Sequence, residues 1–388
     1  MSTATSRTPA TATRLSTLDR FLPVWILAAM AVGLLLAVYA PAVGDLLHAF
    51  TIGSVSVPIA IGLLIMMYPV LAKVRYSDAK RVGTDKRLLV TSLVLNWLVG
   101  PALMFALAWL LLPDLPEYRT GLIIVGLARC IAMVLIWNDL ACGDREAAAF
   151  LVAINSVFQV IAFGALGWFY LQILPAWLGL PTTSAEFSIW AITASVLVFL
   201  GIPLFAGYLS RRVGEATKGR DWYEAKFLPV VGPFALWGLL VTIVMLFALQ
   251  GQQVIAHPGD VARIALPMLI YFIVMFLISF VVGRLLRMTY ERTTTLAFTA
   301  AGNNFELAIA VSVGTFGALS GQALTGIVGP LIEVPALIAL VYVALWLRPR
   351  LFPAALSTPA PVESTGTAAS TPASAAASAA AEHTLNRV

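Results

Sequence analysis

Long apolar runs dominate the sequence and constrain the fold more than any other feature. Ten of them reach roughly 20 residues, the length that a helix needs to cross a bilayer. Because the runs are continuous and do not alternate, they indicate helices and not the strands of a membrane β-barrel. The expected fold is an all-α, polytopic membrane protein with ten transmembrane helices. The expected spans are about 21–41, 53–72, 88–112, 119–141, 146–174, 188–209, 228–250, 261–284, 293–316 and 322–347.

The composition agrees with this fold class. Of the 388 residues, 60% are hydrophobic and only 11% are charged, against about 25% charged in a soluble domain. The residues before Phe21 lack the apolar core and cleavage site of a signal peptide, so the first run is expected to be a retained helix. The two ends, residues 1–17 and 354–388, are rich in Ala, Ser, Thr and Pro, and we expect both to be disordered.

The basic residues predict the orientation in the membrane. With the N-terminus inside, almost all of the 24 Lys and Arg residues fall in cytoplasmic segments. Only Arg119 and Arg263 fall outside, and Arg129 lies within a span. The positive-inside rule therefore places both termini in the cytoplasm, with the chain in the inner (plasma) membrane. The basic loop 74–87 fits this rule as a determinant of topology, and no nucleic-acid partner is expected.

Ten spans divide into two sets of five, so a repeated second half would be inverted relative to the first. We expect a transporter domain over 18–350, with one repeat at about 18–175 and the other at about 186–350. Spans 4 and 9 would correspond, and each contains a polar interruption near the middle of the membrane. Broken helices that meet near the midplane are typical of inverted-repeat transporters.

Glu306 is the only charged residue between Thr293 and Phe316. A carboxylate at the centre of a membrane helix costs roughly 2.5–3.5 kcal/mol on insertion scales, so such residues usually serve a function. Gly302, Asn303 and Asn304 precede it and are poor helix formers, which predicts a break in span 9. A structural ion pair between Glu306 and Arg129 is the alternative, and it is compatible with a functional role.

Cys130 lies within span 4, next to Arg129. A buried cysteine often acts only as a small hydrophobic residue. However, Arg129 supplies a permanent positive charge, and a thiolate is a ligand for a soft metal or metalloid. Cys142 lies 12 residues further on, too far along one helix to share a ligand with Cys130, so a two-thiol site is not expected.

Other polar residues within the spans are candidates for coupling or support. Glu333 lies between Pro330 and Pro335 in span 10, a pattern that we interpret as another broken helix. Its alternative role is a structural bond to a freed backbone amide. Asn96 and Asn155, together with Gln159, are interpreted first as interhelical hydrogen-bonding residues, each bond contributing about 0.6 kcal/mol.

The sequence contains no Walker A, HExxH or GxSxG motif, so ATP-driven pumping and hydrolase chemistry lack visible machinery. We expect no cofactor and no resident metal. A membrane enzyme with Cys130 as nucleophile remains an alternative, but it would need a nearby base. The three histidines, His48, His257 and His383, all fall in predicted loops or the tail.

Several segments resemble the arsenite efflux permeases of the arsenical-resistance-three type, a branch of the bile acid:sodium symporter superfamily. The resemblance covers about residues 16–350. It rests on MMYPVLAKVRY (66–76), TSLVLNWLVGPALMFALAWLLLPD (91–114), GLIIVGLARCIAMVLIWNDLACGD (121–144), ERTTTLAFTAAGNNFELAIAV (291–311) and GPLIEVPALIALVYVAL (329–345).

The resemblance implies two inverted five-helix repeats arranged as a panel domain and a core domain. It also implies export of arsenite as arsenous acid in exchange for protons, in some members with antimonite as well. The essential cysteine of span 4 would be Cys130 and the essential carboxylate of span 9 would be Glu306, with Arg129, Asn303 and Asn304 shaping the site. A sodium-coupled organic-anion symporter of the same superfamily is the alternative; it would need more cations than Arg129 and no Cys130.

Overall fold

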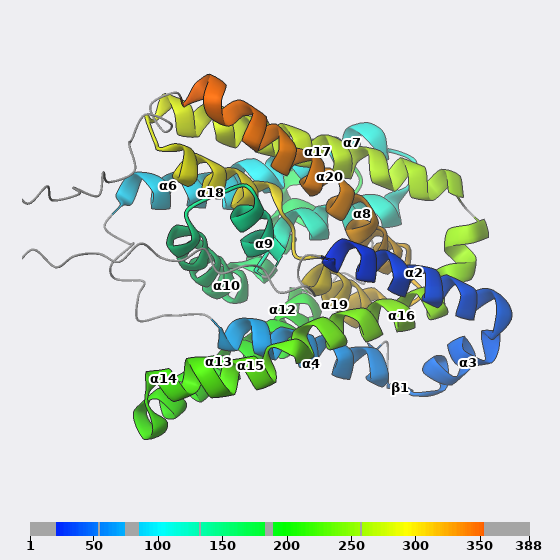
Figure 1. The fold of residues 1–388 in the computed structure, drawn as a ribbon. Coiled ribbons are helices and arrows are strands. Elements are labelled where there is room, and N and C mark those ends of the chain that lie inside the picture. Colours follow the sequence, from blue (N-terminus) through cyan, green and yellow to red (C-terminus); the bar gives the residue numbers. More distant parts are fainter. Residues whose placement is uncertain are drawn as a thin grey trace, which may run out of the picture.

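The fold is built from helices packed side by side (Figure 1). This computed structural model describes residues 21–52, 55–73, 85–131, 133–182, 189–256 and 258–352. Within these residues the only strands are β1 (Thr51–Ile52) and β2 (Val55–Ser56), which pair antiparallel. The tails 1–17 and 354–388 and residues 74–84 of the basic loop lie outside the described residues, so the predictions made for them remain predictions.

The helices follow the predicted apolar spans closely. In the first half they are α2 (Leu22–Tyr39), α3 (Pro41–Ala49), α4 (Val57–Ala72), α6 (Lys86–Val94), η1 (Leu95–Val99), α7 (Gly100–Leu111), α8 (Pro116–Leu127), α9 (Met133–Leu140), α10 (Arg145–Trp168), η2 (Phe169–Ile173) and α11 (Leu174–Trp177). In the second half they are α12 (Ile189–Val196), η3 (Leu197–Gly201), α13 (Ile202–Lys218), α14 (Arg220–Trp222), η4 (Tyr223–Phe227), α15 (Leu228–Val231), α16 (Pro233–Ala256), α17 (Pro258–Leu285), α18 (Tyr290–Ala301), α19 (Phe305–Phe316) and α20 (Gly321–Leu351).

Each of the four π-helical turns, η1 to η4, is followed by a proline at the second residue of the next helix. These prolines are Pro101, Pro175, Pro203 and Pro229. A proline has no N–H to donate and its ring clashes with the carbonyl four residues earlier. A wider π turn relieves that clash and lets the helix continue, so four long apolar helices pass their prolines without ending.

The described residues contain six helices that are long and apolar enough to cross a membrane alone, as a polytopic membrane protein requires. A further pair, α2 and α3, is bent by 100°. The remaining predicted spans are occupied by the 16-residue α4 and by the broken pairs α8–α9 and α18–α19. The polytopic helical fold is therefore confirmed, and the count of ten crossings stays a prediction.

The helices form two packed groups. On one side α16 packs against α2 and α4, and α13 packs against α4. On the other side α17 packs against α7, α18 and α20, while α8 packs against α7 and α20. Figure 1 shows α4 and α13 of the first group along the lower edge and α17, α20 and α7 of the second along the upper edge, with α9, α10, α12 and α19 between them. This arrangement brings the two broken helices to the middle of the molecule.

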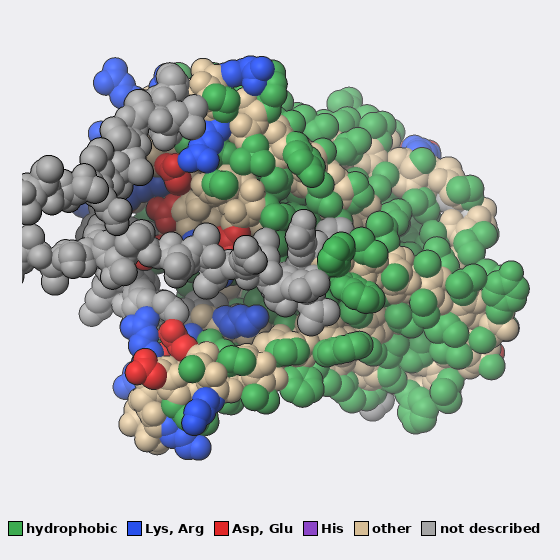
Figure 2. Space-filling view, in the orientation of Figure 1, with side chains coloured by type: hydrophobic (Ala, Val, Ile, Leu, Met, Phe, Trp, Pro, Cys, Tyr) green, Lys and Arg blue, Asp and Glu red, His purple; other side chains and the backbone are tan. Residues whose placement is uncertain are grey.

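Charged side chains gather at one end of the helices. Figure 2 shows most of the visible Lys, Arg, Asp and Glu residues at the left of the view, while hydrophobic side chains cover the visible surface elsewhere. The broad apolar surface is what a bilayer requires of the flanks of a helical bundle.

Candidate functional site

Two broken helices form the centre of the candidate site. α8 ends at Leu127 and α9 begins at Met133, while α18 ends at Ala301 and α19 begins at Phe305. The second break consists of Gly302, Asn303 and Asn304, as the weak helix propensity of these residues predicts. The prediction that spans 4 and 9 are both interrupted is confirmed.

The two breaks cross each other as a short antiparallel pairing. Arg129 and Asn303 form an isolated β-bridge. The amide of Cys130 donates to the Gly302 carbonyl (3.4 Å), and the amide of Asn304 donates to the Ala128 carbonyl (3.0 Å). Backbone N–H and C=O groups that have no partner within a helix need hydrogen-bond partners inside an apolar molecule. Here each break supplies partners for some of the backbone groups of the other. The crossing therefore fixes the relative position of Cys130 and the Asn303–Asn304 pair.

Both half-helices that follow the breaks begin at this crossing. The Asn304 side chain caps α19 by accepting from the amide of Leu307 (3.0 Å). At the start of α9, the Cys130 sulfur accepts from the amide of Val134 (3.3 Å). Helix N-termini carry partial positive charge, so two positive dipole ends converge where Cys130 lies. Discontinuous helices expose such ends to electron-rich ligand groups in transporters.

Arg129 is fully buried and is held in place from several directions. Its guanidinium donates to the Tyr271 hydroxyl (2.7 Å) and to the carbonyl of Gly126. The Gln159 side chain accepts from the Arg129 amide (2.8 Å) and donates to the Arg129 carbonyl (3.0 Å). Among the described residues no ion pair joins Arg129 to Glu306, so the structural pair considered as the alternative role of Glu306 is not present in this conformation.

Glu333 supports the break in span 9. Its Oε1 accepts from the amide of Asn303 (3.2 Å), and the residue is completely buried. This is the structural bond to a freed amide considered above. The expectation of a break around Glu333 was wrong, because α20 runs as one helix through Pro330 and Pro335. Membrane helices tolerate prolines where neighbouring groups satisfy the freed carbonyls.

Several polar atoms at the crossing have no hydrogen-bond partner within the described part of the chain. They are the Arg129 Nε, both polar side-chain atoms of Asn303, the Asn304 Nδ2 and the Glu333 Oε2. All four residues are at most 1% exposed. A buried polar group without a partner destabilises the folded state by about 1–3 kcal/mol. A ligand or an ordered water that hydrogen-bonds to these atoms would remove that cost. Together they offer donors and acceptors beside the Cys130 thiol.

Gly302 allows the close approach at the crossing. A Cβ atom at this position would lie 3.1 Å from the Cβ of Cys130, 3.3 Å from the Phe298 carbonyl and 3.6 Å from the Glu333 Oε1. Gly302 therefore lies between the thiol-bearing residue and the buried carboxylate. The absence of a side chain there keeps Cys130 and Glu333 close together.

Glu306 lies beside a cavity of about 280 Å³ between the first helix group and the central helices α9, α10 and α19. It is partly buried on the first turn of α19. The lining comes from α4, the first break, α9, α10, α16 and the first turn of α19, and includes Ile131 next to Cys130. The charged residues of the lining are Lys73, Asp139, Arg145 and Glu306. Arg145 and Asp139 form an ion pair (3.4 Å). The cavity therefore connects charged residues at the helix ends with a carboxyl group in the interior.

The remaining predicted residues are not gathered at the crossing. The Asn155 Oδ1 accepts from the Trp97 indole (3.2 Å), which joins spans 5 and 3 as an interhelical bond. Asn96 instead donates to the Ser92 carbonyl one turn earlier in its own helix (2.8 Å). Cys142 is exposed and follows α9 with a φ of 56°. Tyr271 was not among the predicted site residues, because its only signal is a hydroxyl group within a mostly apolar span.

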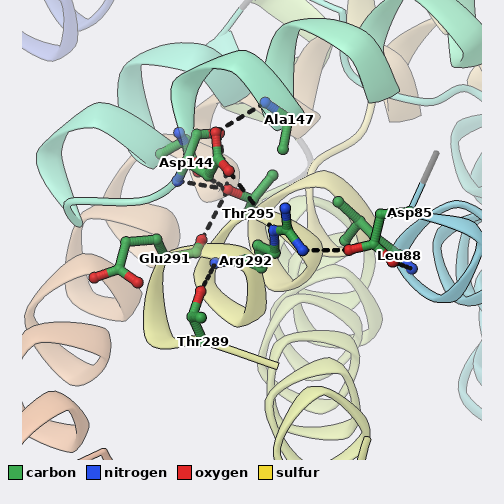
Figure 3. A network of polar contacts seen from close by, with 9 residues as sticks. Asp85, Leu88, Asp144, Ala147, Thr289, Glu291, Arg292 and Thr295 are labelled. Atoms are coloured by element: carbon green, nitrogen blue, oxygen red, sulfur yellow. Dashed lines mark hydrogen bonds and ion pairs between the residues drawn. The ribbon is translucent and has the colours of Figure 1, made fainter. Parts of the chain in front are cut away.

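A polar network anchors the start of α18 at the charged end (Figure 3). Arg292 forms an ion pair with Asp85, which caps α6, and lies 3.9 Å from a carboxylate oxygen of Asp144, which caps α10. The Asp144 amide donates to the Thr295 hydroxyl (2.9 Å). The half-helix that ends at Gly302 is thereby tied to the starts of two long helices.

Comparison with known proteins gives consistent matches. Residues 60–257 match the sodium bile acid symporter family. The arsenical-resistance protein Acr3 of Corynebacterium glutamicum is 62% identical over 363 residues, covering 94% of this chain and 98% of that protein. An uncharacterized transporter of Synechocystis sp. is 35% identical, covering 84% of this chain and 88% of that protein. The arsenical-resistance protein Acr3 of Alkaliphilus metalliredigens is 30% identical, covering 84% of this chain and 92% of that protein.

Proposed function

The chain belongs to the sodium bile acid symporter family and, within it, to the Acr3 arsenical-resistance proteins, and we propose that it exports arsenite in exchange for protons. Membership makes it a multi-pass membrane transporter and not an enzyme. The substrate would be arsenous acid, the neutral form of arsenite, with antimonite as a second candidate. Export of this substrate would confer arsenic resistance.

The observation that carries this proposal is the position of the Cys130 sulfur. It lies at the N-terminus of α9, where the two breaks cross, beside Gly302. Trivalent arsenic is a soft acceptor that suits a sulfur ligand. One thiol holds it reversibly, whereas three would oppose release. The hydroxyl groups of arsenous acid match the unpaired amide atoms of Asn303 and Asn304.

Glu306 is our candidate for the group that exchanges the proton. It is partly buried on α19 and borders the cavity between the first helix group and the central helices. A carboxyl group in this position can gain or lose a proton as its access to water changes. Glu333 is the second candidate, because its Oε2 has no hydrogen-bond partner among the described residues. Arg129 has a positioning role in this scheme, since its two terminal guanidinium nitrogens donate to the Tyr271 hydroxyl and to backbone carbonyls.

The remaining parts of the proposal concern topology. We propose that the protein lies in the inner membrane with both termini in the cytoplasm. The two inverted repeats would be at about 18–175 and 186–350. The charged end seen in Figure 2 supports the cytoplasmic assignment for the ends of α13, α18 and α20. The antiparallel crossing of the two breaks is the geometry that such a repeat would produce.

The test is arsenite transport by the full chain. Everted vesicles from an arsenite-sensitive host, with and without the protein, are energised with an imposed pH gradient and then with an imposed sodium gradient. We expect arsenite accumulation that depends on the protein and on the pH gradient. Accumulation driven by sodium alone, or uptake of an organic anion in place of arsenite, would support the symporter alternative and contradict the proposal.

A further inference from the structure

A second cavity lies at the charged end and shares no lining residue with the cavity beside Glu306. Its volume is about 440 Å³. The start of α6 and the turn between α17 and α18 supply its lining. The lining residues are Asp85, Lys86, Arg87, Leu286, Arg287, Met288, Thr289 and Arg292. Four cations and one carboxylate give these residues a net formal charge of +3. Such a lining favours an anionic ligand.

The positive charge of this cavity is available to a ligand. Asp85 is already used by Arg292, with which it forms an ion pair. Lys86, Arg87 and Arg287 are exposed and form no ion pair with any residue that the structure describes. Three unneutralised cations therefore surround one hollow.

Local structure does not explain why these cations lie here. Lys86 and Arg87 occupy the first turn of α6, where positive charge opposes the helix dipole. Arg287 has a φ of 53°, a conformation that side chains other than Gly, Asn and Asp rarely adopt. The positive-inside rule explains the side of the membrane on which they lie, but not their grouping around a cavity.

We propose that this cavity binds the phosphate-bearing headgroup of an anionic phospholipid. Basic pockets between membrane helices on the cytoplasmic side suit such headgroups. The neighbouring turns carry exposed aliphatic side chains for the acyl chains, with Val90 on α6 57% exposed, and Val281 and Leu285 on α17 56% and 75% exposed. A free phosphate would satisfy the cations but would not use these surfaces.

The bound headgroup would act on α18. Thr289 caps this half-helix by accepting from the amide of Arg292 (3.4 Å), and both residues line the cavity. Figure 3 shows Arg292 between Thr289 and Asp85 at this end of α18. The other end of α18 is Ala301, directly before the crossing. A lipid at the cavity would therefore stabilise the half-helix that positions Asn303.

The test uses the purified full chain in a neutral detergent, with thermal unfolding as the readout. Phosphatidylglycerol, phosphatidylcholine and inorganic phosphate are titrated in separate arms. The variant is Lys86→Gln/Arg87→Gln/Arg287→Asn; asparagine tolerates the left-handed backbone at position 287. The matched control is Arg212→Gln/Lys218→Gln/Lys226→Gln, which removes three exposed cations from the region of α13 to α15 at the same end (Figure 1).

We expect phosphatidylglycerol, and not phosphatidylcholine, to stabilise the wild type and the control variant. In the cavity variant its apparent affinity should fall roughly 100-fold, since each of the three cations near the surface contributes about fivefold. The single variant Arg287→Asn should show part of this loss, which guards against misfolding of the triple variant. Equal stabilisation of wild type and cavity variant would overturn the proposal. Stabilisation by inorganic phosphate without an effect of the lipid would overturn the lipid assignment.

Discussion

Cys130 and Cys142 lie on the same broken span but in different surroundings. Cys130 is 4% exposed, accepts a hydrogen bond from the start of α9 and lies next to Gly302 at the crossing. Cys142 is exposed beyond the end of α9 and has no place in the crossing. The two residues therefore form a matched pair for testing a thiol site, since both substitutions remove one sulfur from the same segment.

Cys130→Ser should abolish arsenite efflux, whereas Cys142→Ser should retain most of it. Serine keeps the size and the hydrogen-bonding capacity of cysteine but is a poor ligand for a soft metalloid. The measurement is arsenite accumulation in everted vesicles, normalised to the amount of inserted protein. Equal activity of the two variants would rule out a single-thiol site at Cys130.

Glu306→Gln should insert and fold but lose efflux driven by a pH gradient. Glutamine keeps the shape of the side chain at the cavity and its hydrogen bonding, but it cannot exchange a proton. We expect arsenite binding by the purified variant to persist while gradient-driven accumulation falls to the level of vesicles without the protein. Glu333→Gln is the comparison. Wild-type accumulation by Glu306→Gln would transfer the coupling role to Glu333.

At the scale of the helices, the sequence was sufficient to predict those features that depend on residue type along the chain. The apolar spans followed from the length of each apolar run, and the break at Gly302–Asn304 followed from the low helix propensity of these residues. The sequence did not reveal that α20 continues through Pro330 and Pro335, because that depends on neighbouring groups in space. The partners of Arg129 were also hidden, since Tyr271 and Gln159 are distant in sequence and their hydrogen bonds depend on packing.

The break between α18 and α19 yields a prediction at the same scale. Gly302→Ala should insert but reduce arsenite efflux, because the new methyl group would lie 3.1 Å from the Cβ of Cys130 and displace it from Glu333. Overpacking of this kind costs about 1–3 kcal/mol. Efflux should fall by roughly tenfold if the strain is relieved at the site.

Gly167→Ala is the matched control for this variant. Gly167 is a buried glycine within α10, and a Cβ atom there would meet its nearest neighbour at 3.6 Å, an ordinary contact distance. Alanine is also the better helix former by about 1 kcal/mol, so this variant should keep both its stability and its efflux. If the two alanine variants transported equally well, close approach at Gly302 would not matter for function.

At the scale of the whole molecule, the cavity beside Glu306 lies between one packed helix group and the central helices. α4 and α16 belong to the first group, while α9, α10 and α19 are central helices on the other side of the cavity. Relative movement of two such groups is the usual way in which a transporter exposes one site to each side of the membrane in turn. In the present arrangement the charged residues of the lining, Lys73, Asp139 and Arg145, place the mouth at the end that we assign to the cytoplasm.

This geometry predicts from which side the cavity can be reached. Ala235 on α16 lines the cavity, and Leu178 lies in the turn after α11 with 57% exposure, at the end predicted to be outside. In a Cys142→Ser background, Ala235→Cys should react with a membrane-impermeant maleimide in everted vesicles and not in spheroplasts. Leu178→Cys should show the opposite pattern.

Arsenite should slow the reaction of Ala235→Cys, because a ligand at the crossing closes the neighbouring cavity or favours the other conformation. Labelling of Ala235→Cys only in spheroplasts would show that the assigned topology is reversed. A labelling rate that arsenite leaves unchanged would show that this cavity is not part of the transport path.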